Sequence, residues 1–481
     1  MSEESANLKQ QTKKGLYWSF FNQFSNVGLN FCVGIVMARL LSPSDYGITA
    51  LPAVFMSVAW ILQNGGLGDA LVRKPDLKEE DLSTAFYYSL AMGLTLYLTL
   101  FFTAPWIADF YETPVLVPLL RVTALSFLWG PLNSAQSVML RRKLDFKTPT
   151  KIALTTRIAS AIIGIVLAYM GYGLWALVVS GVLSSFLTMI LYWFAVKWLP
   201  RAKWDKASFK YLWNYGNKIM ASGMLDTLYQ NITPIFVAKY YSPADLGVYN
   251  RAQGYAALPS QQVTGVIQGV TFPVLSKMQD DNEALARNYR RMLKVTAFIV
   301  FPLMLMLSAL ARPLVITLIT AKWEACILLL QIICFSMMWY PIHAINLNLL
   351  MVKGRSDLFL RLEVIKKIIG LSILVFTLPQ GLVIFCLGNI ASSLICLVVN
   401  TYYTGKLIHI GFFKQMKDLL PIFALSLLMF GAVHLSIHFV ENLYLQILVG
   451  GMVGGIVYLG GAFLFRFKEI EDVLYMLKRK S

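Results

Sequence analysis

Long apolar runs separated by short polar connections follow one another along the whole chain. A helix needs about 20 consecutive apolar residues to cross a hydrocarbon core about 30 Å thick. Membrane-spanning helices are therefore predicted at 16–40, 46–70, 83–108, 114–140, 151–170, 173–197, 214–240, 246–273, 292–318, 325–352, 358–378, 381–404, 417–438 and 443–465. The pattern predicts an all-α polytopic membrane protein with about 14 transmembrane helices.

The composition agrees with a membrane protein. Hydrophobic residues make up 57% of the chain, charged residues 14%, and the mean hydropathy is +0.62. The net charge of +17 would suit nucleic acid if the basic residues formed one surface, but they cluster in the connections between apolar runs. That distribution follows the positive-inside rule. It favours membrane lipids, and no nucleic acid, as the partner of the basic residues.

Alternate connections differ in charge. One set includes "RRKLDFKTPTK" and "SKMQDDNEALARNYRRMLK", and the other includes "SPSDYG", "YMGYG" and "LPQG". The set rich in Lys and Arg is expected on the cytoplasmic side, which places both termini there as well. The outer connections are only a few residues long, so no sizeable outer domain is expected.

A ten-residue phrase occurs twice in the chain. Ala38–Gly47 reads "ARLLSPSDYG" and Ala238–Gly247 reads "AKYYSPADLG", with five of the ten letters identical. The two copies follow the first and the seventh predicted helices. A second pair of similar segments, "RRKLD" at 141–145 and "KGRSD" at 353–357, follows the fourth and the tenth predicted helices.

The two pairs of similar segments predict that a six-helix unit is duplicated in the chain. We expect two homologous six-helix lobes around a central cavity, an N-lobe at 1–205 and a C-lobe at 206–410. Two extra helices and a cytoplasmic tail at 411–481 lie outside the repeat.

Each copy of the phrase has the residues of a helix start. Ser42 suits the N-cap and Asp45 suits the acid of a capping box, with a proline at the first helical position. Ser242 and Asp245 repeat this arrangement. A tight outer hairpin is therefore the main interpretation of the phrase.

The residues that flank each helix start leave two interpretations open. Arg39 and Lys239 end the preceding helices, where a cation favours the helix dipole or lines a cavity. Gly47 and Gly247 are expected to let the new helix approach a neighbour closely.

A stripe of polar residues lies inside the first predicted helix and is repeated in the seventh. Asn22, Asn26 and Asn30 are spaced by four and share one face, and Asp226 and Gln230 occupy the corresponding positions of the seventh helix. Polar side chains in a membrane mostly face protein or a hydrated cavity. The duplicated stripe favours a cavity, with interhelical hydrogen bonding as the alternative.

The eighth predicted helix adds Gln253, Gln261 and an embedded Arg251. Arg251 is expected about 12 Å below the outer end of that helix, at about 1.5 Å per residue. Amides with few acids suit neutral sugar hydroxyls, and a guanidinium pairs with phosphate oxygens in a bidentate manner. Such a cavity suits a sugar that carries a phosphate.

No catalytic constellation is present in the sequence. It contains no HExxH, GxSxG or Walker A pattern, and its four histidines are not grouped as metal ligands. No cofactor or metal is expected, so transport must draw on a proton or sodium gradient or on the substrate's own gradient. Asp226 is the best candidate for an intramembrane proton or cation site. The five cysteines are expected to be small core residues.

Three segments carry a family resemblance. "ARLLSPSDYG", "SPADLGVYNRAQ" and "RRKLDFK" resemble the bacterial polysaccharide-export, Wzx-like flippases of the multidrug/oligosaccharidyl-lipid/polysaccharide (MOP) superfamily, over the chain as far as residue 410. The resemblance implies two lobes that open alternately and move an undecaprenyl-diphosphate-linked oligosaccharide from the cytoplasmic to the outer leaflet of the bacterial inner membrane. It implies a role in O-antigen, capsule or exopolysaccharide synthesis, with a polysaccharide polymerase and other export proteins as partners.

The resemblance also implies roles for particular residues. It implies a cationic cavity, for which Arg251 and Lys239 fit best. Asp45 stands where related lipid II flippases carry an acid near the first hairpin, so Asp45, its counterpart Asp245 and Asp226 are gating or ion-coupling candidates. Two other functions stay open. One is a cation-coupled multidrug exporter of the same superfamily, which should have a more aromatic and acidic cavity. The other is an integral-membrane glycan-modifying enzyme.

Overall fold

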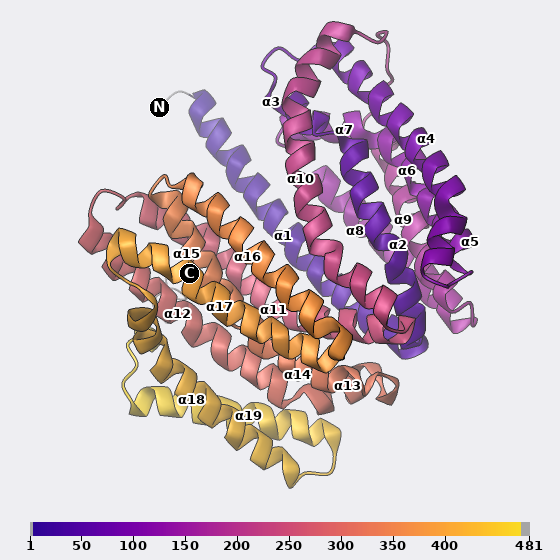
Figure 1. Cartoon of the computed structure of the whole chain (residues 1–481). Coiled ribbons are helices and arrows are strands. Elements are labelled where there is room, and N and C mark those ends of the chain that lie inside the picture. Colours follow the sequence, from indigo (N-terminus) through magenta and orange to yellow (C-terminus); the bar gives the residue numbers. More distant parts are fainter. Residues whose placement is uncertain (1–2, 473–481) are drawn as a thin grey trace. The chain divides into compact units, whose positions relative to one another are not determined.

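The computed structural model describes residues 3–472, and within that range the regular secondary structure is entirely helical (Figure 1). By contacts the chain divides into two compact units, Met1–Gly247 and Val248–Ser481. The predicted lobes, which follow the sequence repeat rather than the contacts, stay a prediction.

The first unit begins with a helix much longer than a membrane crossing requires. Its helices are α1 (Glu3–Leu40), α2 (Pro43–Asn64), α3 (Leu67–Arg73), α4 (Glu79–Phe110), α5 (Leu116–Ala124), α6 (Ser126–Trp129), the 3₁₀ helix η1 (Gly130–Asn133), α7 (Ser134–Arg142), α8 (Lys147–Tyr169), α9 (Leu174–Ala195) and α10 (Lys206–Tyr240).

The second unit takes up most of α11, whose first residues belong to the first unit. Its helices are α11 (Pro243–Ser276), α12 (Asn282–Ala309), α13 (Ala311–Ile319), η2 (Ala321–Trp323), α14 (Cys326–Met337), α15 (Tyr340–Val352), α16 (Ser356–Thr377), η3 (Leu378–Gln380), α17 (Leu382–Ile408), α18 (Phe412–His438) and α19 (Leu443–Leu464).

Ten helical stretches of the described residues are long and apolar enough to cross a membrane. They confirm the all-α polytopic class, whereas the number of 14 spans stays a prediction. The other four predicted spans fall in α1, α10, α11 and α16. These helices have 38, 35, 34 and 22 residues, so they are long enough to cross. The polar stripes of the first three and the charged residues of α16 make them less apolar.

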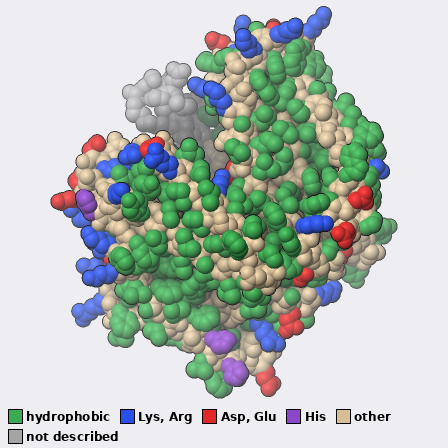
Figure 2. All heavy atoms as spheres, viewed as in Figure 1, with side chains coloured by type: hydrophobic (Ala, Val, Ile, Leu, Met, Phe, Trp, Pro, Cys, Tyr) green, Lys and Arg blue, Asp and Glu red, His purple; other side chains and the backbone are tan. Residues whose placement is uncertain are grey.

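The surface has exposed hydrophobic side chains of the kind that contact lipid. Hydrophobic side chains cover most of the face shown in Figure 2, and Lys and Arg gather at the upper end of the first unit. Phe102 and Trp106, in the second half of α4, are 66% and 72% exposed. Aromatic side chains this exposed on a membrane-length helix are typical of a surface that lipid covers.

Both predicted capping boxes are confirmed. The backbone N–H and the hydroxyl of Ser42 donate to Asp45 Oδ2 at 2.9 and 2.7 Å, and the Asp45 N–H donates to Ser42 Oγ at 3.2 Å. Ser242 and Asp245 make the same three bonds at 3.2, 2.7 and 3.2 Å. The same short sequence thus starts α2 and α11 in the same way.

Two glycines separate α2 from α3 and bring α10 close to them. Gly65 and Gly66 have φ values of +54° and +66°, a left-handed conformation that favours glycine. A Cβ at Gly66 would lie 2.5 Å from the carbonyl oxygen of Gly216, and a Cβ at Gly216 would lie 2.4 Å from that of Gly65. The segment "NGGLGDA" at 64–70 therefore serves tight helix packing.

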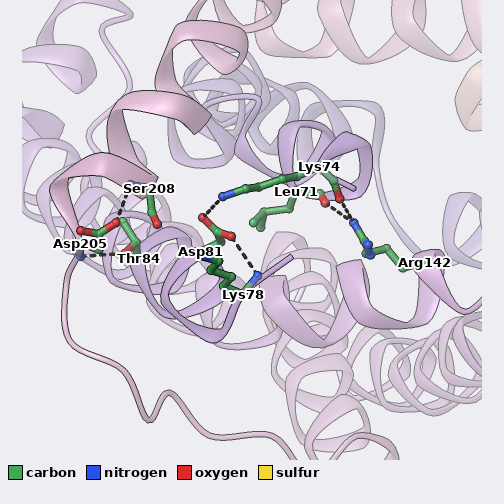
Figure 3. Close-up of polar contacts among 8 residues, drawn as sticks. All are labelled: Leu71, Lys74, Lys78, Asp81, Thr84, Arg142, Asp205 and Ser208. Carbon is green, nitrogen blue, oxygen red and sulfur yellow. Dashed lines mark hydrogen bonds and ion pairs between the residues drawn. The ribbon is translucent and has the colours of Figure 1, made fainter. Parts of the chain in front are cut away.

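The connection that leads into α10 is attached to the start of α4 (Figure 3). The Asp205 N–H donates to Thr84 Oγ1 at 3.0 Å, and Trp198 Nε1 lies 3.1 Å from both carboxylate oxygens of Glu79. Asp205 caps α10, and the hydroxyl and backbone N–H of Ser208 hold the pKa of Asp205 below its usual value. The connection between the predicted lobes is therefore a bound segment of the first unit.

The two helices outside the repeat are attached to the second unit by an ion pair. Figure 1 shows α18 and α19 beside α12, and both pack against it. Arg290 of α12 donates to both oxygens of Asp418 on α18 at 2.6 Å, and Lys294 lies 3.6 Å from the same carboxylate. Asp418 is only 8% exposed, so the pair holds the α18–α19 hairpin on α12.

Arg142 makes the densest set of polar contacts at the end of α3. Its guanidinium donates to the carbonyl oxygens of Leu71, Val72 and Pro75 at 3.0, 3.3 and 3.0 Å, and also to that of Lys74. These bonds satisfy the last carbonyls of α3, which have no partner inside that helix.

We expect Arg142→Ala to lower the free energy of unfolding by about 3 kcal/mol, because a charge-assisted hydrogen bond contributes about 1.5–3 kcal/mol. Its neighbour Arg141 is the matched control, since it bonds only with Asp69 at 3.0 Å among its described contacts and both side chains are 50% exposed. Such a surface pair contributes about 0–1 kcal/mol. Thermal unfolding of both variants in detergent checks this, and equal loss in the two would contradict the assigned role.

Candidate functional site

The two copies of the repeated phrase meet in the first unit. A Cβ at Gly47 would lie 1.6 Å from the carbonyl oxygen of Pro243, and a Cβ at Gly247 would lie 2.0 Å from that of Pro43. Real Cβ atoms essentially never come within 3.0 Å of another atom, so glycine is required at both places. The starts of α2 and α11 therefore pack backbone to backbone and reciprocally, which confirms the predicted close approach.

The cations that precede the two helix starts lie at the ends of α1 and α10. Lys239 Nζ donates to the carbonyl oxygen of Phe110, at the end of α4, at 2.7 Å and lies 3.5 Å from Glu112 Oε1. It also lies 4.7 Å from the centre of the Phe110 ring. Arg39 is exposed in the last turn of α1. Lys239 thus joins α10 to the connection between α4 and α5.

The asparagine stripe of α1 is hydrogen-bonded along the helix and to a neighbouring helix. Asn26 Nδ2 donates to Asn22 Oδ1 at 2.7 Å, and Arg157 of α8 donates to Asn30 Oδ1 at 2.8 Å. Asn30 is exposed, whereas Asn22 and Asn26 are half-buried. The stripe therefore combines the two alternatives: interhelical bonding at Asn30 and polar groups that remain at the surface of α1.

The repeated stripe on α10 has the same spacing but a different pair of bonded residues. Gln230 Nε2 donates to Asp226 Oδ2 at 2.7 Å, and both side chains are exposed. An exposed carboxylate and amide on a helix of 35 residues indicate a hydrated surface rather than lipid. Asp226 is also the stripe's single acid.

Arg251 of α11 is packed on aromatic rings of the second unit. Its guanidinium carbon lies 5.3 Å from the centre of the Trp323 ring and 5.6 Å from that of Tyr255. Trp323 is fully buried, so the guanidinium has a fixed position. Further along α11, Gln253 is half-buried and Gln261 is exposed. A stacked arginine of this kind is well placed to meet a planar or tetrahedral oxyanion.

The acids proposed for gating already have partners in their own turns. The Oδ2 atoms of Asp45 and Asp245 each accept two hydrogen bonds within their capping boxes. Any gating role would therefore act through the stability of a helix start. Among the described residues, no group of three or more His, Cys, Asp and Glu side chains could hold a metal ion.

The first unit contains a cavity of about 450 Å³ between α2, α5, α6 and α9. Its walls are mostly apolar and include Met56, Trp60 and Val182, with hydroxyls from Thr49 and Thr123. None of the predicted substrate-binding residues is among its lining residues. The predicted residues thus lie on α1, including its contact with α8, on α10, including its last turn, and on α11, and not in this cavity.

A polar cluster of the second unit surrounds His343, and the partners of this histidine could not be predicted from the sequence. Ser393 and Asn400 of α17 hydrogen-bond to His343 of α15, beside the bonded pair Glu363 and Lys366 on α16. The signal was a pair of opposite charges three residues apart inside the predicted span 358–378. The expectation for the cysteines holds for Cys326, Cys334, Cys386 and Cys396, which are buried and free, but it was wrong for the exposed Cys32, which faces outward from α1.

Comparison with known families gives a match over most of the chain. The model of the family described as polysaccharide biosynthesis protein matches residues 36–328. The teichuronic acid biosynthesis protein TuaB of Bacillus subtilis (strain 168) is 24% identical over 460 residues, which cover 94% of this chain and 95% of TuaB. The lipopolysaccharide biosynthesis protein WzxC of Escherichia coli (strain K12) is 23% identical over 401 residues, which cover 82% of this chain and 80% of WzxC.

Comparison with solved structures shows the fold. The lipid II flippase MurJ in an inward closed conformation matches with a TM-score of 0.72 and 16% identity, over 94% of this chain and 99% of MurJ. An inward-facing multidrug resistance MATE family transporter of the MOP superfamily matches with a TM-score of 0.60 and 16% identity, over 79% of this chain and 94% of that one. The fold is that of MOP-type transporters, as the resemblance implied.

We expect Gly47→Ala to lower the free energy of unfolding by about 1–3 kcal/mol, the usual cost of forcing an extra methyl group into a close-packed contact. Gly247→Ala should act in the same direction. Gly431→Ala on α18 is the control, because a Cβ there would meet no atom of the described residues within 4 Å. Thermal unfolding measures all three, and a Gly47→Ala protein as stable as the control would show that the helix starts separate easily.

Proposed function

The chain belongs to the polysaccharide biosynthesis protein family, and from that premise we propose that it is a flippase for a lipid-linked oligosaccharide. It would carry the glycan from the cytoplasmic to the outer leaflet by alternating access of two lobes. The observation that carries the proposal is the repeated polar stripe on the membrane-length helices α1 and α10, which is exposed at Asn30, Asp226 and Gln230, in a chain of this family.

The proposed substrate is an undecaprenyl-diphosphate-linked oligosaccharide destined for O-antigen, capsule or exopolysaccharide. Two relatives support a surface glycan by their names, TuaB in teichuronic acid biosynthesis and WzxC in lipopolysaccharide biosynthesis. The name of MurJ, lipid II flippase, supports movement of a lipid-linked substrate by a protein of this fold. A polysaccharide polymerase and other export proteins are the proposed partners, together with membrane lipids.

The polar stripes suit the sugar part of this substrate. Asn22, Asn26 and Asn30 present amide donors and acceptors along one face, and Gln230 extends this chemistry on α10. Amide groups bond neutral hydroxyls without demanding a charge, so they suit glycans of varied composition. Gln253 and Gln261 are proposed to add the same chemistry from α11.

The cations suit the diphosphate part. The Arg251 guanidinium stacks on the ring of Trp323, and a guanidinium can form bidentate bonds with phosphate oxygens. Lys239 would have to exchange the Phe110 carbonyl and Glu112 for a phosphate, and Arg39 stands at the matching position of the first hairpin. We place Arg251 first among the three because the fully buried Trp323 ring supports its guanidinium.

Asp45, Asp245 and Asp226 are the residues proposed for gating and ion coupling. Asp45 and Asp245 stabilise the starts of α2 and α11, and losing such a cap costs about 0.5–2 kcal/mol. A conformational change that opens either hairpin would have to replace those bonds. Asp226, exposed on α10, is the proposed cation or proton site on the polar stripe.

The protein is proposed to lie in the bacterial inner membrane with both termini in the cytoplasm. The Lys- and Arg-rich connections support this orientation through the positive-inside rule. A multidrug exporter is the second candidate, because a MATE transporter shares the fold. The family and the amide-rich stripes favour the glycan. Relatives with biosynthetic and flippase names, together with the absence of catalytic motifs from the sequence, favour a transporter over an enzyme.

Deleting the gene should leave the lipid-linked glycan on the cytoplasmic leaflet, because the head group cannot cross the hydrocarbon core unaided. The measurement is leaflet accessibility of the glycan to an impermeant oxidant or lectin in cells and in inverted vesicles. Complementation by the intact chain should restore outer-leaflet exposure. Unchanged outward delivery in the deletion strain would contradict the proposed function.

Arg251→Ala should reduce export about tenfold or more, since a lost charge-assisted bond of about 1.4 kcal/mol corresponds to tenfold. Arg251→Lys should recover only part of it, because lysine cannot bind in a bidentate manner. Arg312→Ala is the control, as Arg312 lies 3.9 Å from Glu324 and both side chains are more than 60% exposed, at 67% and 64%. Membrane amount and thermal stability are measured in parallel, and wild-type export in the alanine variant would give Arg251 a structural role only.

A further inference from the structure

The connection from α9 to α10 combines exposed cations with exposed apolar side chains. We name residues 197–211, "KWLPRAKWDKASFKY", the basic-aromatic segment. It contains one acid, Asp205, and five cations, all of them exposed: Lys197, Arg201, Lys203, Lys206 and Lys210. Between these cations and after them lie Leu199, Trp204 and Tyr211, which are 59%, 43% and 48% exposed. Figure 1 shows this connection at the upper end of the first unit, where Lys and Arg gather in Figure 2.

The basic-aromatic segment has a fixed position on the start of α4. Its Arg201 N–H donates to Glu79 Oε1 at 3.4 Å, and Trp198 Nε1 binds the same carboxylate at 3.1 Å. The ring of Trp204 packs on that of Phe209, with 5.0 Å between the ring centres. The cations are therefore presented by a backbone that is bound to the first unit at several points.

The charge of the basic-aromatic segment is not neutralised by acids of the first unit. Among the described residues none of its five cations takes part in an ion pair. The neighbouring acids are used in other ways: Asp205 accepts from the Ser208 N–H at 2.7 Å, and Asp81 pairs with Lys74 at 2.7 Å. The exposed surface of the segment is therefore strongly positive.

Several cations at the other Lys- and Arg-rich connections have partners inside the chain. Arg290 binds both oxygens of Asp418 at 2.6 Å, and Arg355 binds those of Asp357 at 2.8 Å. Arg142 binds the last carbonyl oxygens of α3. The positive-inside rule accounts for cations at all of these connections, but it does not account for this difference. A partner outside the chain is therefore expected for the basic-aromatic segment.

We propose that the basic-aromatic segment binds the head groups of anionic phospholipids on the predicted cytoplasmic side of the membrane. The helix before it, α9, is apolar enough to cross the membrane and ends at Ala195, so the segment begins where that helix leaves the hydrocarbon core. Lys and Arg attract anionic lipids over about one Debye length, and Trp and Tyr favour the depth of the head groups. The inference goes beyond the proposed function, because it requires no glycan. A lipid bound here stays with the first unit.

The first test locates bound lipid by photochemical attachment. The full chain is placed in bilayers of phosphatidylcholine that contain a small fraction of phosphatidylglycerol with a photoreactive group next to its head group. The reference bilayer carries the same group on phosphatidylcholine, and mass spectrometry of peptides finds the attached residues. Phosphatidylglycerol should attach to residues 197–211 at least tenfold more than phosphatidylcholine, because each cation near an anionic lipid favours binding. Equal attachment of the two lipids would show an apolar anchor only and overturn the proposal.

The second test removes two charges from the site. Lys206→Gln combined with Lys210→Gln should lower the attachment of phosphatidylglycerol at the segment about tenfold. Lys414→Gln combined with Lys417→Gln is the matched control, because both lysines are exposed near the start of α18 and the change in net charge is the same. Equal loss in the two proteins would assign the effect to net charge alone and overturn the proposal. If the first variant does not fold, the intact chain is measured in 1 M salt, which shortens the Debye length to about 3 Å. Attachment that persists there at its original level would also contradict the proposal.

A third measurement separates phospholipid from other sources of phosphate. Inorganic phosphate, or undecaprenyl diphosphate in lesser amount than the photoreactive phosphatidylglycerol, should leave the attachment in place. Loss of attachment with undecaprenyl diphosphate would assign the segment to a carrier lipid, and loss with inorganic phosphate would assign it to a free anion. Either result would overturn the proposal. A chain that attaches phosphatidylglycerol but delivers no glycan would contradict the proposed function and leave this inference standing.

Discussion

The interior of a membrane supplies no water to a polar group, so each such group must find a partner in the protein or border a hydrated space. This constraint organises both units. Asn26 bonds Asn22, Arg157 bonds Asn30, and His343 sits between Asn400 and Ser393. The partner comes from the same helix at Asn26 and from another helix at Asn30 and His343. Asn30 is nevertheless exposed, so it meets this constraint both through Arg157 and at the helix surface.

Structural features that depend on residues close together in the chain could be predicted from the amino-acid sequence. The capping boxes of α2 and α11 formed as expected, because their partners stand three residues apart. The spacing of four likewise placed the stripe of α1 on one face. The close approach at Gly47 was predicted as a tendency, but its partner, the proline of the other copy, could be known only from the fold.

Contacts between distant segments could not be predicted in this way. Arg142 appeared as one basic residue in a cytoplasmic connection, yet it satisfies the end of α3. For Lys239 the sequence left the helix dipole and a cavity open, and its described partners are the backbone carbonyl of Phe110 and the carboxylate of Glu112, just after α4. Hydropathy also underestimates helices that bear polar faces. For this reason α10, α11 and α16 have the length of a span without the apolar character of one.

The position of α10 limits where the polypeptide can be divided into two parts. By the repeat, α10 is the first helix of the second copy, but it packs on Gly65 and Gly66 and belongs to the first unit. A polypeptide ended at residue 205 would expose that glycine surface, and its complement would begin with a helix that lacks its support. The boundary of the predicted repeat and the boundary of the compact unit therefore differ, and a cut at residue 205 would separate α10 from the glycines on which it packs.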